Sequence, residues 1–527
     1  MSQPAHTPAT LPPLHGTALL LGTLSLSLAT FMNVLDSSIA NVSIPAIAGD
    51  LGVSPGQGTW VITSFGIANA IAVPLTGWLT QRFGAVRLFT LSVLLFVLAS
   101  WLCGLAHSLE MLVFFRVLQG LVAGPMIPLS QTLLLSSYPR AKAGTALALW
   151  GMTTLVAPVA GPLLGGWITD SMSWPWIFYI NIPVGLFAAA LTWSTYRHRE
   201  TPVRKLPIDT IGLSLLVIWV GALQLMLDKG KELDWFASNT IVGLGLVALV
   251  AFAVFVVWEL TEAHPVVDLR LFKGRNFTYG AFTLSVAYAL FFGNVVLLPL
   301  WLQQWMGYTA TNAGIALAPV GILAILITPL IGKKVSVWDP RRIATVAFLG
   351  FAVVLWIRSQ FTVQTDLMHI LIPTVMQGAA MAMFFIPLTT LTLSGIAPER
   401  IPSAAGLSNF ARITAGAMGT SIATTVWDSR ASLHHAHMTE TLIQGQGIFG
   451  ITLESLKASG LTAEQALLHI NRMIDQQAYT RAADDIFLAS AFIYLGLIGF
   501  IWLAKRPMPI PSASGGGSPS SEGGGAH

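Results

Sequence analysis

Charged residues are scarce in this chain, and cysteine is almost absent. Only 9% of the 527 residues are charged, whereas an ordinary soluble domain carries about 25%. A chain so poor in charge cannot cover a water-facing surface, so we expect lipid to be much of its solvent. The single cysteine, Cys103, excludes an intrachain disulfide, and no cysteine spacing suits a metal site. The net charge is +4, with basic residues in short clusters between apolar runs, which favours a membrane topology over nucleic-acid binding.

Long apolar runs take the place of charge. A membrane-spanning helix needs about 20 mostly apolar residues, and fourteen segments meet this requirement. The segment nearest the N-terminus lacks a small-residue cleavage site, so we expect a retained membrane helix rather than a signal peptide. The predicted spans are residues 17–40, 59–79, 86–106, 109–133, 145–168, 176–196, 208–227, 240–260, 277–303, 313–332, 343–357, 367–393, 404–427 and 486–504.

The charge of the loops supports this number of spans. With both termini in the cytoplasm, eighteen Lys and Arg residues fall in cytoplasmic loops and seven fall outside. An excess of positive charge on the cytoplasmic side is the usual topology, and one missed helix would scramble the alternation. We therefore expect a multi-pass protein of the bacterial inner membrane, with an even number of helices and both termini cytoplasmic.

An internal repeat divides the chain. PLTGWLTQRFGAVR at residues 74–87 recurs as PLIGKKVSVWDPRR at 329–342, and VLQGLVAGPMIPL from Val117 recurs as VMQGAAMAMFFIPL from Val375. Helices one to six therefore repeat as helices nine to fourteen, and helices seven and eight are an insertion. The predicted fold is an all-α membrane protein of 14 transmembrane helices, with two six-helix repeats and two inserted central helices, as in an alternating-access transporter. The predicted domains are a cytoplasmic tail at 1–16, a half at 17–200, the inserted pair at 201–265, a half at 266–504 and a disordered cytoplasmic tail at 505–527.

Three charged residues lie well inside predicted spans: Asp36, Arg116 and Arg412. Because charge is costly in a membrane, each is a functional candidate. Asp36 shares a helix face with Asn33, and a carboxylate at low dielectric can load and release a proton as water access alternates. Arg116 keeps its proton, so its natural roles are to bias a nearby acid or to bind backbone carbonyls. A permanent ion pair that fixes the bundle is the structural alternative for Asp36, and Arg412 suits either a functional or a structural role.

The fifth predicted span contains a stripe of small residues and two prolines. Glycine stripes let membrane helices approach closely, and prolines are tolerated where neighbours satisfy the backbone. The residues alone therefore indicate a packing seam or a hinge. They are Pro158, Gly161, Pro162, Gly165 and Gly166.

A pocket for hydrophobic substrates should be apolar with few polar groups. The ninth span offers aromatic residues and an asparagine, and the twelfth adds methionine and phenylalanine as an adaptable wall. Ordinary contact with the core or with lipid explains any single one of these side chains equally well. The candidate cavity residues are Asn33, Asn41, Tyr288, Phe291, Phe292, Asn294, Met381, Phe384 and Arg412.

The longest segment between spans is a polar stretch at 428–485, which the topology places outside the membrane. Its second part has apolar residues at helical spacing. We expect either a solvated lid or spacer, or a docking surface for a periplasmic partner. His434, His435 and His437 form a run, but acidic or cysteine partners are lacking at a fitting spacing, so we expect no metal site.

Four motifs follow one another along the first half: LDSSIANVSIP at 35–45, RVLQG at 116–120, APVAGPLLGG at 157–166 and WPWIFYINIP at 174–183. They resemble those of the major facilitator superfamily, in its fourteen-helix drug:proton antiporter branch. The resemblance implies a proton-driven antiporter, not an enzyme, that exports hydrophobic drugs or toxic amphiphiles. It implies proton coupling through Asp36 and Arg116, an antiporter motif in the fifth span, and the proton motive force in place of any cofactor.

The resemblance also implies partners. These are a periplasmic adaptor protein and an outer-membrane channel, joined with the transporter in a tripartite efflux pump. An exporter of fatty acids or of another lipid-like compound is the nearest alternative. A nutrient uptake symporter usually has more charge in its cavity than three residues, and an intramembrane enzyme needs a catalytic pair that the spans do not offer.

One loop departs from the family pattern. Between the second and third spans the family usually has GxLADRxGRK, whereas this chain has GWLTQRFGAVR, with Gln81 in place of the acid. The usual charge relay at this loop loses its acid, although the glycines that make the tight turn remain. The predicted gating residues are Gly77, Arg82, Gly84, Asp339, Arg341 and Arg342.

Overall fold

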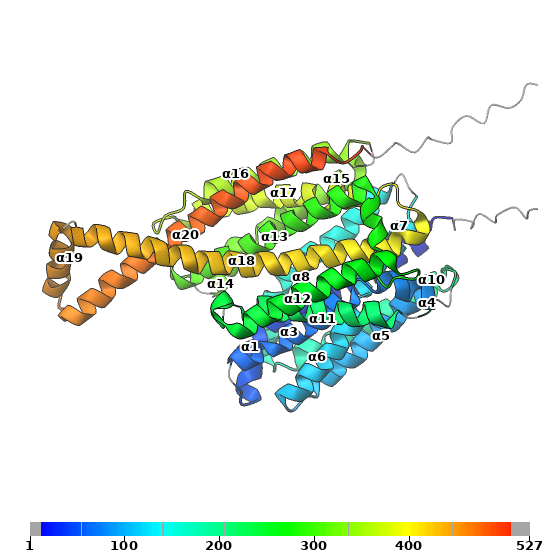
Figure 1. The fold of residues 1–527 in the computed structure, drawn as a ribbon, viewed down its shortest axis with the longest axis horizontal. Coiled ribbons are helices and arrows are strands. Elements are labelled where there is room, and N and C mark those ends of the chain that lie inside the picture. Colours follow the sequence, from blue (N-terminus) through cyan, green and yellow to red (C-terminus); the bar gives the residue numbers. More distant parts are fainter. Residues whose placement is uncertain are drawn as a thin grey trace, which may run out of the picture.

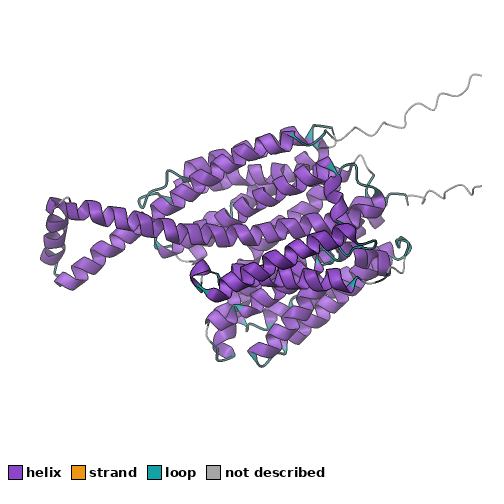
Figure 2. Cartoon of the chain, viewed as in Figure 1, coloured by secondary structure: helices purple, strands orange, loops and turns teal. Residues whose placement is uncertain are grey.

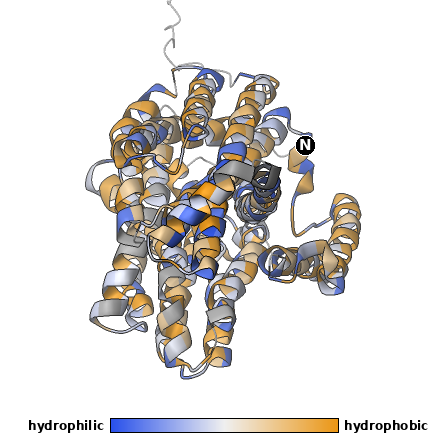
Figure 3. Ribbon diagram, turned by 90° about the vertical axis from the view of Figure 1, so that its left-hand side faces the viewer, coloured by the Kyte–Doolittle hydropathy of each residue, from blue (hydrophilic) through white to orange (hydrophobic). Residues whose placement is uncertain are grey.

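The computed structural model describes residues 12–53, 55–139, 142–203, 207, 209–230, 232–308, 310–335, 337–444 and 446–506. Helices make up most of these residues, and no strand occurs among them (Figure 2). The predicted all-α fold is confirmed. Hydrophobic residues dominate many of the helices (Figure 3), and large apolar side chains such as Leu20, Leu249 and Val257 are exposed, as a lipid-facing surface requires. Most of the two predicted tails lies outside the described residues.

The helices fall into two halves and a central insertion. The first half contains α1 (Gly16–Asp50), α2 (Pro55–Gly58), α3 (Trp60–Ala72), α4 (Thr76–Phe83), α5 (Ala85–Gly104), α6 (Leu109–Ala123), α7 (Met126–Ser137), α8 (Ala143–Ser171), α9 (Trp176–Tyr179) and α10 (Asn181–Tyr196). The insertion contains α11 (Thr210–Lys229), the 3-10 turn η2 (Trp235–Ala237) and α12 (Asn239–Thr261). The second half contains η3 (Leu269–Lys273), α13 (Arg275–Gln304), α14 (Ala310–Leu317), α15 (Val320–Lys334), α16 (Pro340–Arg358), α17 (Leu367–Thr392), η4 (Pro398–Arg400), α18 (Ile401–Gln444), α19 (Gln446–Ala458) and α20 (Ala463–Trp502).

Helices stand at all fourteen predicted spans. In the described residues, 11 helical runs are long and apolar enough to cross a membrane, and the pair α3 and α4, bent by 63°, makes up to 12. Pro74 lies in the break between α3 and α4, where its missing N–H cannot continue the helix. α8 and α18 occupy the two remaining positions. The structure is thus consistent with fourteen spans.

The two halves lie side by side, with the blue and cyan helices on one side of the bundle and the yellow to red helices on the other (Figure 1). The inserted pair bridges them on the outside, because α11 packs against both α3 and α18. Trp219 of α11 meets Phe410 of α18 edge to face, with 5.6 Å between ring centroids. The insertion therefore covers a seam between the halves.

The segment at 428–485 is a helical hairpin. α18 continues for 44 residues, α20 for 40, and the short α19 joins their far ends beyond the bundle (Figure 1). Trp427 donates to the Tyr479 carbonyl at 2.8 Å and packs on its ring, which ties the two arms where they leave the bundle. α20 starts at a capping box formed by Thr462 and Gln465. The predicted span ends at residue 427, and polar residues continue α18 beyond it to Gln444.

The two halves touch closely at the end of the bundle that carries both described termini, here called the terminal end (Figure 1). A Cβ placed on Gly77 of α4 would come within 2.1 Å of Ser403 Oγ on α18. Likewise, a Cβ on Gly144 of α8 would come within 2.3 Å of the Gly332 carbonyl on α15. Glycine is what lets these helices meet. The halves are therefore closed against each other at the terminal end.

Candidate functional site

Asp36 of α1 and Arg116 of α6 form a buried ion pair. Arg116 Nη1 lies 2.6 Å from Asp36 Oδ2, and both side chains have no exposed surface. Asn33 lies one turn earlier on the same face of α1. Its side chain also points to α6 and donates to the Ala123 carbonyl at 3.1 Å. Two of the three predicted intramembrane charges therefore lie in contact.

The second oxygen of the Asp36 carboxylate accepts hydrogen bonds from neutral side chains. Asp36 Oδ1 accepts hydrogen bonds from Asn181 Nδ2 at 2.7 Å and from Gln119 Nε2 at 3.1 Å. Gln119 also accepts from Arg116 at 2.7 Å and donates to Ser100 Oγ at 2.8 Å. Five residues from four helices thus form one closed network, which we call the Asp36 cluster. The sequence reasoning missed Gln119, Asn181 and Ser100, although the first two lie in the quoted RVLQG and WPWIFYINIP motifs.

The guanidinium of Arg116 is held on several sides. Its Nε donates to the Val61 carbonyl of α3 at 2.9 Å, and its Cζ lies 4.2 Å from the centroid of the Phe65 ring. Its Nη2 has no hydrogen-bond partner among the described residues. Removing one partner from a buried pair costs about 3–5 kcal/mol, because a charge is left uncompensated. A proton on Asp36 would remove one charge of the pair and so weaken this side-chain link between α1 and α6.

The glycines of the fifth predicted span pack α8 against α1. A Cβ on Gly161 would come within 2.3 Å of Ser38 Oγ, and one on Gly165 within 2.8 Å of the Ile39 side chain. Both contacts lie within one turn of Asp36. A Cβ on Gly166 would meet nothing within 4 Å. Pro158 and Pro162 lie within α8, and their side chains are outside the described part of the chain.

Arg412 lies in an aromatic site in the second half, away from the Asp36 cluster. Its guanidinium lies 4.5 Å from the Tyr288 ring and 5.1 Å from the Phe385 ring. Tyr288 also contacts the rings of Phe292 at 4.9 Å and Phe384 at 6.3 Å. The structure thus brings together five of the predicted cavity residues, namely Tyr288, Phe291, Phe292, Phe384 and Arg412.

The other predicted cavity residues make different contacts. Asn294 is buried between α13 and α20 and donates to Ser490 Oγ at 3.1 Å. Met381 is buried in the same apolar core as Phe384. Asn33 faces α6 rather than the aromatic site. The side chain of Asn41 is outside the described part of the chain.

The predicted gating residues of the first half form the expected turn. Gly84 has a φ of 86°, a conformation that favours glycine. A Cβ there would meet Glu200, whose carboxylate caps α5 by accepting from the Val86 and Arg87 amides at 3.0 and 2.9 Å. Arg82 lies over the Trp78 ring at 5.5 Å. Gly77, as described above, packs against the other half.

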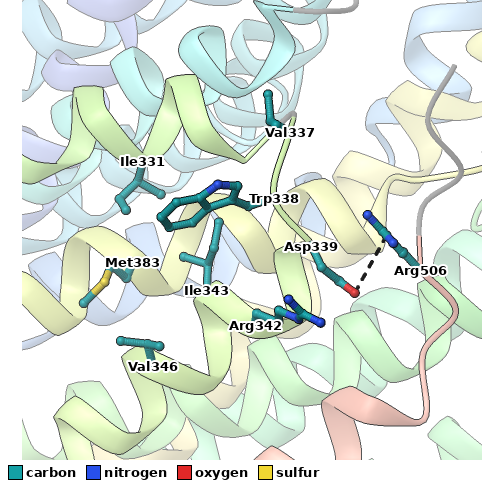
Figure 4. A pocket seen from close by; sticks show the side chains of 9 residues that line it. All are labelled: Ile331, Val337, Trp338, Asp339, Arg342, Ile343, Val346, Met383 and Arg506. Carbon is teal, nitrogen blue, oxygen red and sulfur yellow. Dashed lines mark ion pairs between the residues drawn. The ribbon is translucent and has the colours of Figure 1, made fainter.

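The predicted gating residues of the second half bind within that half. Asp339 caps α16 and pairs with Arg341 Nη2 at 2.7 Å, while Arg341 Nη1 donates to the Ala504 carbonyl at 3.1 Å. Arg506 lies 3.9 Å from the same carboxylate, and Arg342 and Asp339 line a cavity of about 490 Å³ (Figure 4). Burial acts to raise the pKa of Asp339, but the hydrogen bonds from Arg341 hold that pKa below its usual value. These charges tie α16 to the end of α20.

Several polar groups escaped the sequence reasoning. Arg358, which directly follows the predicted span 343–357, is the buried last residue of α16 and donates to Gln377 Oε1 at 2.7 Å. Glu259 is a second fully buried acid, bonded to the Val267 amide at 3.1 Å.

The histidine run has acidic partners on the opposite arm of the hairpin, which local spacing could not reveal. The pairs are His434–Asp485 at 2.8 Å and His435–Asp475 at 2.7 Å. In the described part of the chain, no three His, Cys, Asp or Glu side chains come together as metal ligands.

Known proteins share this architecture. The family model of the Major Facilitator Superfamily matches residues 26–420. The chain is 52% identical to the multidrug export protein EmrB of Escherichia coli K12, over 98% of this chain and 99% of that protein. It is 50% identical to the fatty acid resistance protein FarB of Neisseria gonorrhoeae, over 96% and 99%. The solved structure of the proton:xylose symporter XylE has a TM-score of 0.56 at 15% identity, covering 92% of this chain and 96% of that one.

The likeness to XylE shows the fold, and the family model and the relatives show the family. The resemblance drawn from the sequence motifs is thereby confirmed. The chain is a multi-span membrane transporter and not an enzyme. It belongs to the Major Facilitator Superfamily.

Proposed function

We propose that this transporter is a proton-driven antiporter that exports hydrophobic drugs or toxic amphiphiles across the bacterial inner membrane. The observation that carries the proposal is the fully buried Asp36–Arg116 pair. Within the Asp36 cluster the carboxylate is the group suited to exchange a proton, because the guanidinium keeps its own. Nearly full-length similarity to a multidrug export protein supports the class of substrate.

The geometry supports a simple cycle. With the terminal end taken as cytoplasmic, the halves are closed toward the cytoplasm, so protons reach the cluster from outside. Arg116 is seven residues from the start of α6, which corresponds to about 10 Å along the helix axis. Protonation of Asp36 weakens its hold on Arg116, and α1 can then shift against α6 and α8. Release of the proton to the cytoplasm restores the pair.

Proteoliposomes with an imposed pH gradient test this proposal. We expect the wild type to move a hydrophobic dye against the flow of protons, and Asp36→Asn to lose this gradient-driven transport while still inserting normally. Asp50→Asn is the matched control, because Asp50 lies at the far end of the same helix and accepts from Trp174 Nε1 at 2.7 Å. Full gradient-driven transport by Asp36→Asn would remove the coupling role. Dye movement in the same direction as protons would indicate a symporter instead.

We further propose that the transporter works with a periplasmic adaptor and an outer-membrane channel, and that the helical hairpin is its adaptor contact. The hairpin projects beyond the bundle and carries exposed apolar side chains, including Ile451 and Leu468. A cavity of about 460 Å³ lies between its arms. The apolar lining includes Met438, Phe449, Ile470, Met473 and Ile474.

Deletion of residues 441–468 tests the adaptor contact. The deletion leaves the His435–Asp475 and Arg430–Asp485 pairs in place, so we expect the bundle to fold and to bind dye while adaptor pull-down is lost. The surface variant Ile451→Asp should weaken pull-down without any deletion. Unchanged pull-down in both variants would overturn the proposed contact.

A further inference from the structure

The three buried arginines in the described part of the bundle differ in their partners. Arg116 pairs with a carboxylate. Arg358 is held by Thr374 Oγ1 at 3.2 Å and Gln377 Oε1 at 2.7 Å, all within the second half. Among the described residues, Arg412 has a single hydrogen bond, from Nη2 to Asn409 Oδ1 at 2.6 Å. Arg412 is thus a charge whose burial is only partly compensated.

The cost of burying Arg412 is high without a counter-charge. A guanidinium has five N–H donors, and here one of them holds a side-chain oxygen. The rings of Tyr288 and Phe385 face the cation and offset some of its desolvation. No described carboxylate forms a salt bridge with it. The remaining N–H groups are therefore available to an anion.

Arg412 also lies where the two halves meet. Its partner Asn409 donates to Gln131 Oε1 of α7 at 3.0 Å, which joins the second half to the first. Phe385 stacks on Trp150 of α8, with 5.3 Å between ring centroids. In transporters built from repeats, substrates bind near the midplane between the repeats. The cation is therefore at the position where a transported molecule is expected.

Apolar surface continues from the cation along one face of α18. Gly416 follows Arg412 by one turn of α18, and two aromatic rings of α13 lie against it. A Cβ on Gly416 would touch the rings of Tyr288 at 3.5 Å and Phe292 at 3.7 Å, and both rings are only half-buried. A ligand with a charged head and an apolar body would find both parts of its surface matched here.

We propose that Arg412 binds the carboxylate head group of amphiphilic substrates, whose apolar body lies against Tyr288 and Phe292. One guanidinium compensates one negative charge, and its planar fork matches the two oxygens of a carboxylate. This proposal deepens and rests on the proposed export function, since it names a substrate class for the same transporter.

Binding of a C10 carboxylate and of its methyl ester to the purified transporter tests the proposal. In Arg412→Gln we expect carboxylate affinity to fall about tenfold or more, because a charge-assisted hydrogen-bonded pair is lost, while ester affinity stays unchanged. The carboxylate affinity of Arg412→Lys should lie between those of the wild type and Arg412→Gln, since lysine keeps the charge and loses the planar fork of the guanidinium. Arg358→Gln is the matched control, and we expect it to leave the ratio of the two affinities as in the wild type.

Two results would contradict the proposed site. One is an equal loss of carboxylate affinity and ester affinity in Arg412→Gln and Arg412→Lys, which indicates a structural role for Arg412. The other is an unchanged carboxylate affinity in Arg412→Gln. Thermal unfolding of each variant shows whether it is folded. If Arg412→Gln misfolds, Arg412→Lys is compared with the wild type instead. Binding is measured without a pH gradient, so the two proposals are tested separately. A wild type that shows no antiport would not contradict the carboxylate site, and absence of the site would not contradict antiport.

Discussion

Gln119 and Gln377 occupy matching positions of the two sequence repeats, and each binds an arginine in a buried polar cluster. Gln119 also lies 3.1 Å from Asp36 Oδ1. Gln377 likewise accepts from its arginine, Arg358, at 2.7 Å, but no described carboxylate is bonded to that arginine. The cluster of the first half therefore contains a carboxylate, whereas the arginine of the second half is held by neutral side chains. This asymmetry is why we assign proton coupling to the first half alone.

Arg116→Lys should impair gradient-driven transport by about tenfold or more while the protein inserts and folds. Lysine keeps the charge near Asp36 but cannot hold Gln119, the Val61 carbonyl and the acid in one planar geometry. The measurement is the initial rate of dye movement in proteoliposomes. A wild-type rate in Arg116→Lys would show that only the charge matters.

Gly165→Leu should destabilise the protein by about 1–3 kcal/mol, because the new side chain overpacks the contact between α8 and α1. A Cβ at this position already lies 2.8 Å from the Ile39 side chain. Gly166→Leu, at the next residue of the same helix, is the matched control because nothing lies within 4 Å of its Cβ position. Thermal unfolding in detergent compares the two, and equal stability would contradict the packing seam.

Gly332→Leu should hold the terminal end open. A Cβ there would lie 2.6 Å from the Ala148 side chain of the opposite half. Gly321→Leu on the same helix is the control, since its Cβ position is free. The reporter is Leu147→Cys, a buried position in this contact, in a background where Cys103 is replaced by Ala. Thiol labelling from the terminal side should increase in Gly332→Leu only, and equal labelling in both would refute the closed contact.

Asp339→Asn should lower thermal stability at pH 7, and the difference from the wild type should shrink as the pH falls. The folded pKa of Asp339 is held below its unfolded value, so its contribution is present above the unfolded pKa and is lost as the pH falls through the folded one. Asparagine is as good a helix cap as aspartate, so the comparison isolates the charge pairing with Arg341. A difference that does not depend on pH would contradict this assignment.

The sequence predicted the parts of the structure that depend on local pattern. Helices stand where the apolar runs predicted spans, and the cost of intramembrane charge selected Asp36 and Arg116. The bonds of Asp36 to Asn181 and of Arg116 to Val61 join residues far apart in the chain, so periodicity carries no trace of them. Helical spacing indicated the second arm of the hairpin, but the continuation of α18 past residue 427 was not predicted, because hydropathy marks where lipid ends and not where a helix ends.

The most direct test of the central claim is proton release on substrate binding, measured with purified transporter in weakly buffered detergent solution. If one group exchanges proton for substrate, the two ligands are thermodynamically linked, and binding of either expels the other. We predict that dye binding releases a proton from the wild type and from Asp50→Asn, and releases none from Asp36→Asn. Equal proton release from Asp36→Asn would contradict the account.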